Sequence, residues 1–140
     1  KGNKISSKYY TVSYASGRKK VGKYKVTIKL KGNYSGTLTA YFTINPKETK
    51  VSSISAAKKS LKVKISKQSS QVTGYEIQYS TSSKFKSAKT KKVTSYKTTS
   101  VTLKSLKAKK TYYVRVRTYK VVDGKKYYSD WSSKKSKKTK

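Results

Sequence analysis

The chain has 140 residues, and its 37 Lys and Arg residues outnumber its four Asp and Glu residues so far that the formal net charge is +33. It contains no Cys, which excludes a disulfide framework and thiolate metal sites. It also contains no His, so without His and Cys the commonest general base and the best nucleophile of enzymes are absent, and we expect neither catalysis nor a cofactor. No segment approaches the roughly 20 apolar residues of a membrane-spanning helix, and no signal peptide is recognisable.

Lys carries almost all of the positive charge, because only Arg18, Arg115 and Arg117 are Arg. Lys is a compact, strongly hydrated charge that suits an exposed face better than bidentate recognition. A genome rich in A and T raises the Lys count, but it does not account for the scarcity of carboxylates. Because the charge stays uncompensated, we expect a polyanionic neighbour, with teichoic acid, an acidic glycan, nucleic acid and a membrane surface as the alternatives.

The composition also raises the question of whether the chain folds. Val, Ile, Leu and Phe make up less than a fifth of the residues, which together with this charge is typical of many disordered chains. The 14 Tyr residues favour a folded state instead, because each buries a large ring and prefers β-strands.

The first part of the chain is predicted to form half-buried antiparallel strands over 9–14, 23–30 and 37–44, because apolar and polar residues alternate there. A turn is expected between the second and third of these, at Gly32–Gly36. The apolar positions expected to share one side are Tyr10, Val12, Tyr14, Tyr24, Val26, Ile28, Leu30, Leu38, Ala40, Phe42 and Ile44.

A boundary follows at Asn45-Pro46, since Pro cannot donate to a central sheet ladder. We predict a first domain at 1–46, a connector at 47–52 and a second domain at 53–140. The sequence opens at Lys1-Gly2-Asn3, which is typical of a loop, and we expect it to be part of a longer chain.

The second part alternates again, and Asp123-Gly124 is a strong hairpin signal. Lys84–Lys92 is expected to be a charged loop, and the tail from Ser132 is expected to fray. No segment shows helical periodicity over three turns, so the predicted fold class is an all-β sandwich. The strands are expected at 61–65, 75–79, 101–103, 112–122 and 125–131.

Residues from about 50 to 140 resemble a fibronectin type III domain, through Gly74–Ser80 and through the corner Leu106–Val116. The resemblance implies an immunoglobulin-like β-sandwich with a tyrosine corner. In that corner Leu106 anchors a turn, and the Tyr112 hydroxyl bonds back to the backbone of that turn. The segment 127–132 is similar to the last strand of the family. Two positions depart from the family pattern: Ile65 stands where Trp is usual, and Ala108 stands where Pro is usual.

Residues 1–46 resemble the later strands of a bacterial immunoglobulin-like repeat, through Tyr9–Tyr14, Val21–Ile28 and Gly32–Thr37. The resemblance implies a partial β-sandwich that exposes an edge and part of its core. Together the two modules are similar to pieces of cell-surface or secreted proteins of Gram-positive bacteria. This implies an extracellular or cell-wall-associated location.

Arg115 and Arg117 alternate along one strand, so we expect them on one face, beside Trp131 on a strand that pairs with it. Each guanidinium gains about 0.5–1 kcal/mol by stacking on an aromatic face at an exposed site. The set resembles the Trp–Arg ladder of some cytokine-receptor fibronectin domains, which implies a structural outer face. A ligand platform is the alternative.

Several tyrosines are expected to be exposed, namely Tyr9, Tyr41, Tyr113, Tyr119 and Tyr128. Their rings are able to stack on sugars or bases. Strand propensity with partial burial is the simpler interpretation.

The carboxylates give little support to catalysis. Glu76 and Asp130 form a glycosidase-like pair only if the fold brings them within about 5–10 Å. Surface ion pairing with Lys is the simpler interpretation. A divalent cation such as Ca²⁺ requires several oxygen ligands close together, so we expect no metal site. The remaining carboxylates are Glu48 and Asp123.

The sequence therefore favours a non-catalytic spacer or adhesion module of a bacterial surface or secreted protein. Four Lys-rich segments are interpreted as solvated faces and loops that contact anionic cell-wall polymer or glycan, and they also keep sheet edges from pairing. An accessory glycan-binding module of a secreted hydrolase is the alternative, and a nucleic-acid binder ranks third. The four segments are 23–31, 58–67, 84–92 and 104–110.

Overall fold

The computed structural model describes residues 4–140; the opening Lys1-Gly2-Asn3, expected to be a loop, lies outside the described residues. Among those described residues all regular structure is β except the short 3₁₀ helix η1 (Ser7–Tyr9), which confirms the predicted all-β class. The chain divides into two compact units, Lys1–Ile44 and Asn45–Lys140.

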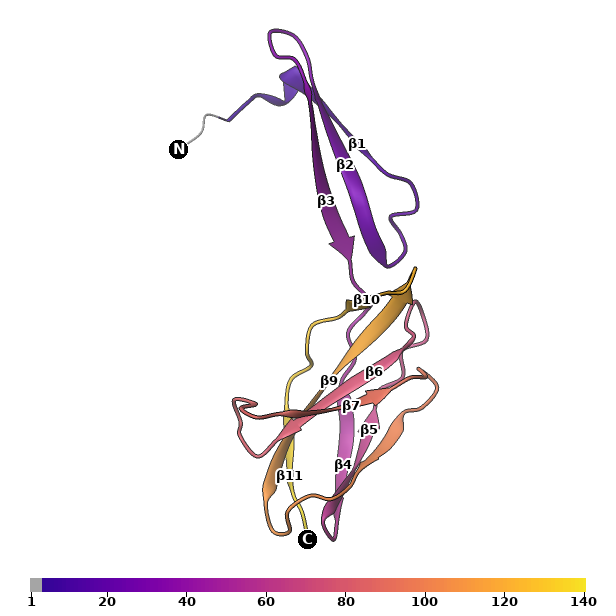
Figure 1. Ribbon diagram of the computed structural model, residues 1–140, viewed down its shortest axis with the longest axis vertical. Coiled ribbons are helices and arrows are strands. Elements are labelled where there is room, and N and C mark those ends of the chain that lie inside the picture. The colour runs from indigo at the N-terminus through magenta and orange to yellow at the C-terminus, as the bar shows by residue number, and fades with distance from the viewer. Residues whose placement is uncertain (1–3) are drawn as a thin grey trace. The chain divides into compact units, whose positions relative to one another are not determined.

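The first unit is an antiparallel sheet of three strands, β1 (Tyr10–Tyr14), β2 (Gly22–Leu30) and β3 (Thr37–Ile44), in that order (Figure 1). The register pairs Val12 with Ile28 and Ile28 with Leu38. Facing residues in an antiparallel pair share one side of the sheet. The predicted apolar positions therefore form one continuous side, as expected from their period of two.

That apolar side is largely uncovered. The exposed fraction is 40% for Val12, 51% for Tyr14 and 58% for Leu38. Within residues 4–44 the buried apolar side chain is Val21. Among residues 4–44 the unit is therefore a single layer of three strands, and the partial sandwich expected there stays a prediction.

The second unit contains two sheets (Figure 1). One has the order β4-β5-β8. The other has the order β10-β9-β6-β7, and β11 also pairs with β9. The strand bounds are β4 (Val51–Ala57), β5 (Ser60–Ile65), β6 (Gly74–Ser80), β7 (Lys89–Val93), β8 (Ser100–Leu103), β9 (Thr111–Val122), β10 (Lys125–Tyr128) and β11 (Lys135–Lys138).

The core of this unit lies between the two sheets. Leu61, Val63 and Ile65 point inward from β5, and Val114 and Val116 point inward from β9. The β6 residues Tyr75 and Ile77 complete the centre and are fully buried. Ile65 thus fills a buried position, as expected for the residue that stands where Trp is usual. The predicted sandwich is confirmed.

Three strands, β4, β7 and β11, were not predicted, because none of them shows an uninterrupted alternation of apolar and polar residues. β4 buries Val51 and half-buries Ile54 and Ala56, but a register shift between Val51 and Ser53 interrupts its alternation. β7 takes up the last part of the loop expected at Lys84–Lys92, whereas residues 84–88 are a loop as expected. β7 is an edge strand with only Val93 buried, and lysines protect such edges. The fraying expected from Ser132 is wrong as well, since β11 pairs with β9 through its backbone.

The tail beyond β11 is also held. Thr139 is buried; its hydroxyl donates to the Lys107 carbonyl at 2.6 Å and accepts from the Lys110 amide at 3.2 Å. The Lys140 amide donates to the Ala57 carbonyl at 3.3 Å. Backbone groups and one hydroxyl, not apolar side chains, therefore fix this end of the second unit.

The division into units falls between Ile44 and Asn45, and β4 begins at Val51, within the connector predicted at 47–52. Pro46 is buried in the second unit. As a division into parts that fold independently, the boundaries 1–46, 47–52 and 53–140 stay a prediction.

Gly74 is required by the close approach of β7 to β6. A Cβ there would lie 2.1 Å from the Val93 carbonyl oxygen and 2.9 Å from the Tyr119 hydroxyl. We expect Gly74→Ala to lower the free energy of unfolding by about 3 kcal/mol or more, because backbone must move to relieve the overlap. Urea denaturation of the full chain measures this loss.

Gly124→Ala is the matched control. Gly124 has φ +73° and nothing within 4 Å of its added Cβ, so this change costs only the left-handed conformation, about 1–2 kcal/mol. Equal losses in the two variants would contradict the proposed overlap at Gly74.

Candidate functional site

The candidate site is the outer side of β9, which is built by strict alternation. Tyr112, Val114 and Val116 face the core, so Arg115 and Arg117 face outward. β6 supplies the neighbours on this side, because its register pairs Glu76 with Arg117 and Gln78 with Arg115.

Arg117 is held by charge and by aromatic rings. Its Nη2 and Nε donate to Glu76 Oε2 at 2.8 and 3.1 Å. Its guanidinium lies 3.9 Å from the ring centre of Tyr128 and 4.4 Å from that of Trp131. The ion pair is mostly buried, with side-chain exposures of 26% for Arg117 and 5% for Glu76. Glu76 is therefore the charge partner of Arg117, not the surface partner of a lysine that we expected.

Arg115 occupies the next step along the strand. Its Nε donates to Gln78 Oε1 at 2.7 Å, and its guanidinium lies 4.1 Å from the Phe85 ring and 4.8 Å from Trp131. Burial, and secondly the charge of Arg117, lowers the pKa of Arg115. A neutral amide thus faces Arg115 where a carboxylate faces Arg117.

Trp131 lies between the two guanidinium groups, as expected, but it does not belong to the predicted strand at 125–131. β10 ends at Tyr128, and the segment that follows is fixed by hydroxyl and backbone bonds to β9. The Ser132 amide donates to the Val116 carbonyl at 2.8 Å, and the Val116 amide donates to Ser132 Oγ at 3.1 Å. The pattern of Ser and Asp residues around Trp131 gave no sign of this break.

Tyr119 was expected to be exposed, and that expectation is wrong: its exposed fraction is 4%. Tyr119 lies opposite Gly74 on β6, and because Gly74 has no side chain there is space for the Tyr119 hydroxyl. Its hydroxyl lies 3.5 Å from the Val93 carbonyl. Burial raises the pKa of Tyr119, and the charges of Glu76 and Tyr128 add to the increase.

The other tyrosines named from the sequence have mixed surroundings. Tyr113 and Tyr128 are half-buried, with Lys134 Nζ lying 5.7 Å from the Tyr113 ring centre. Tyr9 is half-buried, and Tyr41 is exposed beside Lys23. Only Tyr41 therefore offers most of its surface to solvent.

The tyrosine corner lies at the start of β9. The Lys107 amide donates to the Tyr112 hydroxyl at 3.0 Å, and Leu106 is buried in the core. Both side chains thus fix the turn between β8 and β9.

On the outer side of β9 the arginines and aromatic rings therefore stack on one another, and their polar groups bond within the protein. Each guanidinium has a hydrogen-bond partner, and each lies against two rings, which covers much of the aromatic surface that a ligand would use. The geometry supports the structural interpretation of Arg115, Arg117 and Trp131 over the ligand platform.

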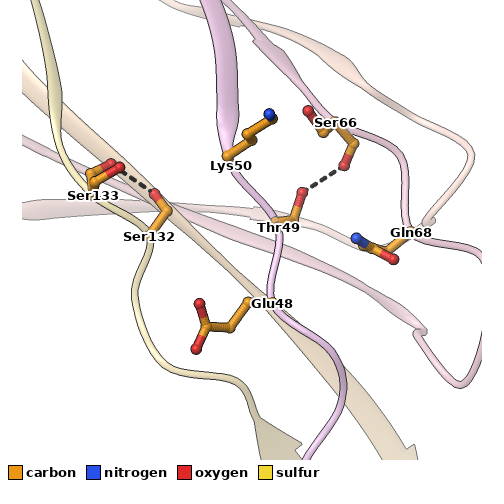
Figure 2. A pocket seen from close by; sticks show the side chains of 7 residues that line it. All are labelled: Glu48, Thr49, Lys50, Ser66, Gln68, Ser132 and Ser133. Atoms are coloured by element: carbon orange, nitrogen blue, oxygen red, sulfur yellow. Dashed lines mark hydrogen bonds between the residues drawn. The ribbon is translucent and has the colours of Figure 1, made fainter.

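A separate cavity of about 330 Å³ has one carboxylate, Glu48, among its lining residues. Figure 2 shows the side chains that line it. Thr49 donates to the Ser66 carbonyl on one wall, and Ser132 donates to the Ser133 carbonyl at 2.9 Å on another. No second acid lines this cavity, so a paired-carboxylate mechanism has no basis there. Across residues 4–140 no group of three or more acidic or metal-binding side chains gathers that would hold a metal ion.

The family model of the fibronectin type III domain matches residues 44–135. The chain belongs to the fibronectin type III family. The crystal structure of chicken CNTN1 FN1-FN3 domains is similar to it, with a TM-score of 0.60 and 22% sequence identity, over 86% of this chain and 43% of that chain. The chain thus spans less than half of that relative, and the likeness shows the fold. The comparison with curated proteins finds no match.

The fibronectin type III prediction is thereby confirmed, with a match that begins a few residues earlier than the expected start near residue 50. The match leaves out almost all of 1–46. The immunoglobulin-like repeat predicted there, and the bacterial source, stay predictions.

Trp131 is expected to stabilise the fold. Trp131→Ala removes two guanidinium–ring contacts and part of a half-buried ring, so we expect the free energy of unfolding to fall by about 1–3 kcal/mol. Trp131→Phe, which keeps a ring between the arginines, is expected to lose less than half of that. Thermal and urea denaturation measure both; an unchanged stability together with lost binding of a ligand would contradict the structural role.

Glu76→Gln tests the ion pair while keeping the shape of the side chain. We expect a loss of about 1–3 kcal/mol, because Arg117 then keeps a hydrogen-bond acceptor but loses its counter-charge in a largely buried position. Asp130→Asn is the control, since Asp130 is exposed and the change removes the same charge. If both variants lose equally in urea denaturation, net charge and not the ion pair determines the effect.

Proposed function

We propose that the chain is a non-catalytic spacer or adhesion module of a bacterial surface or secreted protein, whose Lys-rich faces contact an anionic cell-wall polymer or glycan. The observation that carries the proposal is the placement of charge. Among residues 4–140 the ion pair in the structure joins Arg117 to Glu76, whereas exposed lysines follow the strands of both units. Exposed strand lysines include Lys23, Lys25, Lys29, Lys62, Lys64, Lys91 and Lys92.

The family supports the spacer part of the proposal. Fibronectin type III domains commonly serve as spacers or adhesion modules and are generally non-catalytic. The stack on the outer side of β9 and the hydrogen-bonded tail both stiffen the second unit. A stiff module suits a role in holding neighbouring parts of a longer chain apart.

The family also supports an extracellular setting, because fibronectin type III domains are typically extracellular. In the part of the chain from residue 4 onward, none of the helices has the length and apolar character needed to cross a bilayer.

Exposed tyrosines favour a second candidate, an accessory glycan-binding module of a secreted hydrolase. Tyr14, Tyr34 and Tyr41 are among the exposed large side chains. Aromatic faces stack on sugars with little dependence on charge, so this candidate predicts binding that survives high salt.

Salt separates the candidates. We expect the affinity of the full chain for teichoic acid or heparin to fall at least about tenfold between about 0.05 and 0.5 M salt, because the contacts are charge-driven and counterions are released. Isothermal titration at several salt concentrations measures the slope, with neutral dextran as the control polymer.

Each other outcome points elsewhere. Affinity for neutral sugars that persists at high salt would favour the glycan-binding module of a hydrolase. Binding of DNA or RNA well above teichoic acid at matched salt would favour the nucleic-acid binder. Affinity for teichoic acid or heparin that does not change with salt would contradict the charge-driven mechanism.

A further inference from the structure

A second cavity of the fibronectin unit collects lysines without any acid. Its volume is about 470 Å³, and it lies between the loop that joins β6 to β7 and the loop that joins β8 to β9. Four lysines line it, Lys86, Lys89, Lys104 and Lys107. No Asp or Glu is among its lining residues, so the local positive potential is not offset.

The fold brings these lysines together from two separate segments. Lys86 and Lys89 come from the segment 84–92, and Lys104 and Lys107 come from the segment 104–110. In the sequence the two look like unrelated charged loops. Like charges repel, so four exposed lysines around one hollow store repulsion that an anion in the hollow would relieve.

The walls of the cavity are fixed before any ligand arrives. Ser80 Oγ donates to the Lys86 carbonyl at 2.7 Å and accepts from the Ser82 amide at 3.0 Å, which ties down the first loop. The second loop is held because the Lys107 amide donates to the Tyr112 hydroxyl at 3.0 Å. Pre-organised walls reduce the entropy that binding costs.

The lining also offers contacts for a ring. Tyr79 is half-buried, lines the hollow and lies against Tyr112, with 6.5 Å between ring centres. Thr81, Ser87 and Ser105, which carry hydroxyl groups, line the same hollow. An aromatic wall, several hydroxyls and a cationic rim suit a ligand that carries a ring, hydroxyl groups and negative charges at once.

We propose that this cavity binds an acidic carbohydrate, with a sugar ring against Tyr79 and anionic substituents at Lys86, Lys89, Lys104 and Lys107. The volume lies in the range of small-ligand sites. Lysines provide point charges without the fixed fork of arginine, so they accept sulfate, phosphate or carboxylate groups on the sugar. The inference rests on the proposed contact with anionic polymer and assigns it to one place.

Two variants of equal net charge test the site. One replaces Lys86, Lys89, Lys104 and Lys107 with Gln; the control replaces the exposed lysines Lys62, Lys64, Lys67 and Lys125, none of which lines the cavity, with Gln. The probe is a heparin-derived hexasaccharide, titrated into the full chain at about 0.15 M salt. We expect the cavity variant to lose at least about tenfold more affinity than the control.

The outcomes separate the two proposals. Equal losses in both variants would overturn the cavity and leave the charge-driven function standing. Absence of binding by the parent chain even at low salt would overturn the proposed function itself. Denaturation curves check that each variant remains folded. An NMR titration of the parent chain gives an independent result, with the largest amide shifts expected at Thr81, Ser87 and Ser105; shifts centred on β5 instead would overturn the site.

A further comparison tests the ring contact. We expect Tyr79→Leu to weaken the hexasaccharide about fivefold or more and to leave linear polyphosphate of equal charge unchanged, because polyphosphate has no ring to stack. Equal weakening for both probes, or parent-chain affinity for polyphosphate above that for the hexasaccharide, would overturn the assignment to a carbohydrate.

Discussion

The constraint on which this structure depends is a positive charge that the chain has almost no means to neutralise. With 37 cationic side chains and four acidic ones, ion pairing cannot hold the surface together. Alternating strands solve the problem geometrically, since every second residue faces outward. Tyr75, Ile77, Val114 and Val116 supply the core from β6 and β9 while lysines stay in water. The rest of the architecture follows from the need to separate the two kinds of residue.

The outer side of β9 is where positive charge is brought close to the protein body, and there the chain uses arginine. A planar guanidinium lies flat against a ring and still donates sideways to a neighbour, which an ammonium group does less well. Arg117 uses both properties, with Tyr128 and Trp131 at its faces and Glu76 at its edge. Lysine serves wherever charge only has to remain hydrated, so the distribution of the two residue types follows from their chemistry.

Strands whose residues alternate between apolar and polar were predicted from the sequence. Strands that form mainly because a neighbouring strand offers backbone hydrogen bonds were missed. β7 and β11 are rich in lysine and exist because β6 and β9 offer them backbone partners. Arg115, Arg117 and Trp131 were found because their spacing defines one face. The burial of Tyr119 was missed, since it depends on Gly74 across the sheet. The lysine cavity could not be read from the sequence either, because its two loops meet only in the folded unit.

The two units show what alternation does and does not determine. Both have strands with a period of two, and in both the apolar residues fall on a common side. In the second unit a further sheet covers that side, and residues such as Val63 and Val116 become fully buried. In the first unit residues 4–44 form no second layer, and Leu38 remains 58% exposed. Alternation therefore fixes which side of a strand is apolar, whereas burial requires a partner layer that local pattern cannot supply. The hydrophobic contribution to stability accordingly resides in the second unit, and the first relies more on strand pairing and on local bonds such as the Tyr24 hydroxyl to the Gly17 carbonyl.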